Sequence, residues 1–212
     1  MILDNISIIR HLLKFKEGVF YFIQVIQRKK ENPELPKSDM KRYQCFITSE
    51  KDFDQHLPRI KKVCEDYNAR AYISLLPRSL EKLGKCCLLE YAKRVNSGDY
   101  SRIWDIPSRL ALSADTRMAK VLPKPLRMFD VDTKPELEPI VNMVNSIGLN
   151  LIEIIPTPHG FHVFVEAFNP SILEKNGITT SGEDYILPDG KTKFTYREEC
   201  NTILYAADSK SL

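Results

Sequence analysis

The order of apolar runs and helix-ending residues between positions 126 and 168 most constrains the fold of this chain. An apolar run at 126–132 comes first, and Pro135 then opens a stretch of apolar residues at helical spacing that Gly148 closes. Proline is favoured in the first turn of a helix, and glycine is favoured just after its last turn. This part of the sequence therefore predicts a strand followed by a helix.

Two hairpins are predicted after that helix. Apolar runs at 149–155 and 161–168 flank a short segment with two prolines and a glycine, which is typical of a tight turn. Further on, Asp189-Gly190 separates the strand-like segments 185–187 and 193–196, and this dipeptide is a strong hairpin signal.

The rest of the chain has the same mixed character. Gly98 and three prolines divide the stretch 97–125, which predicts only short helices. We expect a single α+β domain over residues 1–212. It would consist of an N-terminal αβ layer (1–69) and a mixed or antiparallel sheet of the ferredoxin or RNA-recognition-motif (RRM) type (70–212). The remaining expected helices are at 5–16, at 50–67 with Ser49 as its cap, and at 79–95 with Ser79 as its cap. The remaining expected strands are at 19–26, at 42–47 antiparallel to 19–26, at 70–78 and at 202–206.

Composition excludes several classes of protein. The chain has 212 residues, 43% of them hydrophobic, with a net charge of +3, so any phosphate-binding surface must be a local patch. Its five cysteines form no C-x-x-C pair, which argues against a disulfide framework or a structural zinc site and favours a reducing cytoplasm. Charged residues interrupt the apolar N-terminal stretch, so we expect no signal peptide and no membrane partner.

Two carboxylates lie at the end of the strand predicted at 126–132. Asp130 and Asp132 are two residues apart, so they should project from the same face of a strand. Two like charges at that distance repel each other unless a cation lies between them, and Mg²⁺ or Mn²⁺ suits hard oxygen ligands. The alternative is that the pair only ends a strand and caps the next helix.

A second motif opens the strand predicted at 161–168. In Thr157-Pro-His-Gly-Phe-His162, Gly160 lets the backbone approach a ligand closely, and backbone N–H groups of such a turn can bind phosphate. His162 could donate a further hydrogen bond to phosphate. Taken alone, His162 reads as a core or edge histidine, and His159 as a solvated turn residue.

Together the two motifs resemble those of archaeo-eukaryotic primases and primase-polymerases. Phe129-Asp-Val-Asp132 looks like the aspartate–apolar–aspartate motif of that family, and Thr157-Pro-His-Gly-Phe-His162 looks like its Gly-x-His motif, in the same order. The resemblance covers residues 126–168 well and 70–206 loosely. It implies that Asp130 and Asp132 bind divalent metal ions. It also implies that His162 contacts the phosphates of an incoming nucleotide, with Gly160 and Thr157 in the same turn.

The family also has a third acidic residue on a later strand, and here the chain departs from the pattern. Asp208, Glu198 and Glu199 are the candidates, and a chain without this ligand could bind nucleotides without joining them. Arg70 and Arg78 bracket one predicted strand and are further candidates for nucleotide binding, because arginine binds phosphate through two donors. Arg28, Lys29 and Lys30 read as a solvated charged surface.

The sequence thus predicts a metal-dependent nucleotidyltransferase of the primase-polymerase type. Its partners would be nucleoside triphosphates, a nucleic-acid template, and a helicase or other replication protein supplied by another chain. Two alternatives remain: a non-catalytic nucleic-acid-binding module on an RRM-like sheet, and a metal-dependent nuclease. The sequence does not decide between DNA and RNA, or among priming, extension and repair.

Overall fold

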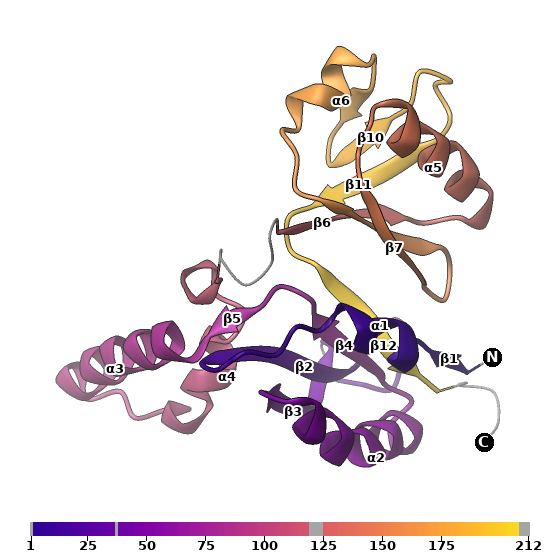
Figure 1. The fold of residues 1–212 in the computed structure, drawn as a ribbon. Helices are drawn as coiled ribbons and strands as arrows, with labels where there is room; N and C mark the ends of the chain where they lie inside the picture. The colour runs from indigo at the N-terminus through magenta and orange to yellow at the C-terminus, as the bar shows by residue number, and fades with distance from the viewer. Residues whose placement is uncertain (1, 37, 119–124, 208–212) are drawn as a thin grey trace. The chain divides into compact units, whose positions relative to one another are not determined.

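The computed structural model describes residues 2–36, 38–118 and 125–207. The chain forms two compact units, one made of Met1–Leu122 with Ile203–Leu212 (unit 1) and one made of Pro123–Thr202 (unit 2). The described residues form a mixed α+β structure with antiparallel strand pairs, as the sequence predicts (Figure 1).

Unit 1 is built on one sheet with strand order β1-β12-β4-β2-β3, and β5 pairs with the first part of β2. Its central strand β2 pairs antiparallel with β3 and with β4. The strands are β1 (Leu3–Asp4), β2 (Val19–Gln27), β3 (Met40–Ile47), β4 (Arg70–Ser74), β5 (Arg78–Ser79) and β12 (Asn201–Ala206). The first two residues of β12, Asn201 and Thr202, belong to unit 2. The helices are α1 (Ile6–Leu12), α2 (Glu50–Asp66), α3 (Leu80–Ser97) and α4 (Ile106–Leu110).

The strand predicted at 70–78 is in fact two strands, and this prediction is corrected. β4 ends at Ser74, and β5 begins at Arg78, where the chain pairs with a different part of β2. Pro77 lies between them and cannot donate a ladder hydrogen bond, which explains the interruption. Both strands lie in the sheet of unit 1, so residues 70–79 are not part of the sheet that carries Asp130 and His162.

Helices α2 and α3 begin where the sequence places their caps. The hydroxyl of Ser49 accepts a hydrogen bond from the Asp52 backbone N–H, and Ser79 does the same for Lys82. α3 ends at Gly98, whose φ of 68° is a left-handed conformation that glycine adopts without strain. One face of β2 packs through Phe20 and Phe22 against residues of α3 and α4.

Unit 2 is a six-stranded antiparallel sheet with order β7-β8-β6-β11-β10-β9. The chain runs through β6, α5, β7, β8 and α6, then through the added hairpin β9–β10, and ends in β11 beside β6. The strands are β6 (Leu126–Val131), β7 (Leu151–Pro156), β8 (Phe161–Glu166), β9 (Thr179–Ser181), β10 (Asp184–Ile186) and β11 (Lys193–Arg197). The helices are α5 (Leu137–Ser146) and α6 (Ser171–Lys175), and a single 3-10 turn (Lys134–Glu136) precedes α5.

The two faces of this sheet differ in chemistry. Phe129 and Val131 of β6 and Val163 of β8 pack with Ile140 and Val144 of α5 in one buried apolar cluster. Side chains alternate between faces along a strand, so Asp130 and His162 lie on the opposite face. The polar candidates therefore occupy the face turned away from α5.

No helix in the described parts of the chain is long and apolar enough to cross a membrane. The charges that interrupt the apolar N-terminal stretch agree with this finding.

Candidate functional site

Asp130 and His162 face each other across the β6–β8 pair. They are directly opposed in register, and His162 Nε2 lies 3.3 Å from Asp130 Oδ1. The His162 ring is buried, whereas the Asp130 carboxylate is about one third exposed. The structure thus brings together the two motifs that lie about thirty residues apart in sequence.

The other ring nitrogen of His162 has a partner as well. His162 Nδ1 lies 2.8 Å from Thr202 Oγ1, and Thr202 is fully buried. Because a carboxylate only accepts hydrogen bonds, the consistent assignment for a neutral ring is Nε2–H donating to Asp130 and the Thr202 hydroxyl donating to Nδ1. Asp130 therefore fixes the tautomer of the ring, and the bond to Thr202 helps to fix its orientation.

Gly160 fits against β6 in a way that no other residue can. A Cβ atom at this position would lie 1.8 Å from the Val131 carbonyl oxygen, far inside van der Waals contact. The Thr157 hydroxyl accepts a hydrogen bond from the Gly160 N–H at 3.0 Å, and the Thr157 N–H donates to the Gly160 carbonyl. Both N–H groups are thus used within the turn itself. The absence of a side chain at Gly160 is what allows the turn to approach the Asp-x-Asp strand closely.

A polar row continues from Asp130 toward the other edge of the sheet. Thr195 is directly opposite Asp130 on β11, and its hydroxyl donates to Asp184 Oδ1 at 3.0 Å. Lys193 Nζ lies 3.2 Å from Asp184 Oδ2. The hydrogen bond from Lys193, together with that from Thr195, holds the pKa of Asp184 below its ordinary value.

Asp132 follows the last residue of β6 and is exposed. Its charge helps to raise the pKa of Lys193, after the larger effect of Asp184, so Asp132 lies on the Lys193 side of the site. No three histidine, cysteine or acidic side chains converge as a metal-ion site anywhere in residues 2–36, 38–118 and 125–207. Glu198 and Glu199 lie in the connection between β11 and β12, and Asp208 lies outside the described residues.

The two arginines predicted to bind nucleotide both lie in unit 1. Arg70 Nη2 lies 2.5 Å from Glu31 Oε1. Arg78 is fully buried, and its Nη1 donates to the Ser113 carbonyl at 2.7 Å and to Thr116 Oγ1 at 2.9 Å. Their observed bonds are thus internal to unit 1.

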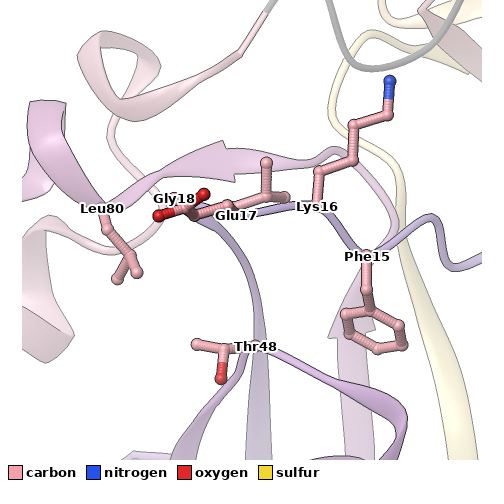
Figure 2. Close-up of a pocket in the computed structure, with 7 residues that line it drawn as sticks. Phe15, Lys16, Glu17, Gly18, Thr48 and Leu80 are labelled. Atoms are coloured by element: carbon pink, nitrogen blue, oxygen red, sulfur yellow. The ribbon is translucent and has the colours of Figure 1, made fainter.

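Unit 1 has an open pocket of about 350 Å³ between the α1–β2 connection and the end of β3 (Figure 2). Thr48 is one of its few polar side chains, but its hydroxyl donates to Asp52 Oδ2 at 2.7 Å. Figure 2 shows the Lys16 amino group extending away from the other labelled side chains. The pocket contains none of the predicted site residues; it is lined by Phe15, Lys16, Glu17, Gly18, Val19, Thr48 and Leu80.

Three polar residues of the site were not predicted from the sequence: Thr202, Thr195 and Asp184. Thr202 is forty residues from His162, and Thr195 becomes a neighbour of Asp130 only through the pairing of β11 with β6. A register between the Asp189-Gly190 hairpin and β6 would have been needed to find Thr195 and Asp184. Comparison of the chain with protein-family models, with curated proteins and with solved structures finds no match.

Proposed function

We propose that this protein is a metal-dependent nucleotidyltransferase of the primase-polymerase type, acting on nucleoside triphosphates and a nucleic-acid template. The observation that carries the proposal is the direct pairing of Asp130 with His162 at 3.3 Å, on the face of the sheet turned away from α5. Two motifs with the order and residue types of that family thus meet at one place.

The topology of unit 2 supports the same assignment. Without the β9–β10 hairpin, its elements follow the order β-α-β-β-α-β, with β6 and β8 in the centre and β7 and β11 outside. This order supports the ferredoxin-like or RRM plan that we propose for unit 2, in which the first and third strands are central.

The donor set suits a hard divalent cation. Asp130 and Asp132 offer carboxylate oxygens beside the end of β6, and Asp130 is exposed enough to reach a ligand. Mg²⁺ or Mn²⁺ held there would neutralise phosphate charge and align the reacting groups. His162 is buried and held at both ring nitrogens, so it orients the Asp130 carboxylate beside which the phosphates would bind.

The test is nucleotide incorporation by purified protein on primed and unprimed templates, with Mg²⁺ or Mn²⁺ and all nucleotides. The proposal expects product from the wild-type protein and at least about a hundredfold less from Asp130→Asn, whose shape is nearly unchanged. Circular dichroism and thermal unfolding confirm that the variant is folded. Absence of product from wild-type protein on every template would overturn the proposal, and conversion of the template to short fragments would favour a nuclease.

A second candidate is a nucleic-acid-binding module without catalysis. It is favoured by one observation: in the described parts of the chain, no third carboxylate joins Asp130 and Asp132 in a metal-binding group. Retention of template binding in both wild-type protein and Asp130→Asn, without any product, would support this module.

A further inference from the structure

Charge is divided unevenly between the two units. Residues 123–202 contain 7 of the 31 Lys and Arg and 12 of the 28 Asp and Glu, a net charge of −5. The remaining residues contain 24 Lys and Arg and 16 Asp and Glu, a net charge of +8. The small charge of the whole chain therefore hides a basic unit 1, and a basic part of a protein attracts polyanions.

Two arginines of unit 1 are stacked on tyrosines where β3 meets α2. The Arg42 guanidinium lies 4.5 Å from the Tyr67 ring centroid, and that of Arg59 lies 5.2 Å from the Tyr43 ring centroid. Arg42 and Tyr43 are neighbours on β3, while Arg59 lies in α2 and Tyr67 caps its end. Both pairs thus join the same edge strand to the same helix, which pack together (Figure 1).

These two arginines differ from most of the others in unit 1. Arg10, Arg28, Arg70, Arg94, Arg102 and Arg109 all form ion pairs with carboxylates. Among the described residues, neither Arg42 nor Arg59 has a carboxylate partner; Arg42 Nε donates to the neutral Gln27 side chain at 2.7 Å. No ion pair with another described residue neutralises their charge, and Arg59 and Tyr67 are exposed.

We infer that the surface formed by Arg42, Tyr43, Arg59 and Tyr67, which we name the β3–α2 surface, binds the phosphates of a single nucleic-acid strand. A guanidinium stacked on an aromatic ring is already oriented, so less side-chain freedom is lost when it binds a phosphate. Arginine also matches phosphate geometry through two parallel donors. The exposed Tyr67 places an aromatic ring beside the strand, and aromatic rings are stacking platforms for bases in single-strand sites.

The spacing suits a strand. Arg59 and Tyr67 are eight residues apart, so their positions are separated by about 12 Å along α2 at about 1.5 Å per residue. A nucleic-acid strand has a phosphate about every 3.4 Å of duplex axis, and phosphates are further apart in an extended strand. One strand following α2 can therefore reach both guanidiniums.

The inference takes from the proposed function only that the protein acts on nucleic acid, and it requires neither a metal ion nor catalysis. The test is binding of a fluorescein-labelled 20-nucleotide DNA strand, measured by anisotropy in EDTA over a range of salt concentrations. For Arg42→Glu/Arg59→Glu we expect roughly tenfold weaker binding and a slope of log K against log salt that is reduced by about 1.4, from two lost phosphate contacts. Arg42→Gln/Arg59→Gln should also weaken binding and reduce the salt slope.

The matched control is Lys85→Glu/Lys93→Glu. It makes the same change in net charge in the same unit, at exposed positions on α3. This control should bind much more tightly than the arginine variant. Equal loss in both variants, or wild-type binding by the folded glutamine variant, would overturn the inference. A loss confined to the arginine variants, in a protein that never incorporates nucleotide, would support the surface and reject the proposed function.

Discussion

His162 is held between Asp130 and Thr202, with its Nε2 3.3 Å from the carboxylate and its Nδ1 2.8 Å from the hydroxyl. The imidazole therefore has no free ring nitrogen among its observed contacts. If the site acts as proposed, the histidine positions the Asp130 carboxylate as well as facing the substrate.

Replacing Thr202 should weaken this arrangement without touching the substrate. We expect Thr202→Val to lower kcat for nucleotide incorporation roughly tenfold, because Nδ1 loses the hydrogen bond that orients the ring. Thr202→Ser keeps the hydroxyl, so its kcat should stay near that of the wild-type protein. The measurement is kcat and KM over pH 6 to 9, where Thr202→Val should also move the pH profile. Equal effects of valine and serine would mean that packing, not the hydrogen bond, is what the position supplies.

Gly160→Ala should be strongly destabilising. The added methyl would lie 1.8 Å from the Val131 carbonyl oxygen, so the turn or the end of β6 must move, at a cost of about 3 kcal/mol. Urea unfolding measures the difference. The control is Gly84→Ala in α3, where the methyl meets nothing within 4 Å and should instead stabilise the helix by about 0.5–1 kcal/mol. A stable Gly160→Ala protein would contradict the close approach.

Arg78→Lys tests whether this arginine stabilises unit 1 or binds nucleotide. Lysine cannot reproduce the hydrogen bonds of the buried Nη1 to the Ser113 carbonyl and the Thr116 hydroxyl. The free energy of unfolding should therefore fall by about 2–3 kcal/mol. Arg102→Lys on the exposed surface should change stability by less than about 0.5 kcal/mol. Wild-type stability combined with weaker nucleotide binding would assign Arg78 to the nucleotide site.

Two buried thiols should make the protein sensitive to alkaline pH. Burial raises the pKa of Cys45 and of Cys64 to about 12, from 9.0. The folded state thus keeps a proton on each thiol that the unfolded state releases. The contribution of each thiol to stability is therefore constant below about pH 9 and falls as the pH rises toward 12, by at most about 1.4 kcal/mol per pH unit. Urea unfolding in reductant at pH 8 to 10.5 measures the slope. The free energy of unfolding of Cys64→Ala should fall less steeply with pH than that of the wild-type protein. An unchanged slope would contradict the effect of burial.

Local signals in the sequence predicted most elements correctly. Ser49 and Ser79 cap their helices as expected, and the hairpin at Asp189-Gly190 pairs β10 with β11. The antiparallel pairing of β2 with β3 is confirmed too. These features depend on neighbouring residues, whose patterns are visible along the chain. The prediction of one strand at 70–78 was wrong because Pro77 lies between two separate pairings with β2.

The site was only partly predictable, because its geometry depends on pairing between distant strands. The motifs around Asp130 and His162 could be read from residue types and spacing. Thr202 and Asp184 could not, since each joins the site through a strand register that periodicity does not reveal. Gly160 was expected to make room for a ligand, whereas the structure shows that it makes room for the Val131 carbonyl.

Strand β12 lies between β1 and β4, although it comes last among the strands of the chain. During synthesis, β4 lacks this neighbour until residue 206 has left the ribosome, whereas every strand of unit 2 has already emerged. The N-terminal sheet is therefore completed after the strands of unit 2 have been made, which reverses the usual N-terminal-first order of folding. A chain released a few residues before β12 would carry β6 to β11 attached to an N-terminal sheet whose β4 has an open edge.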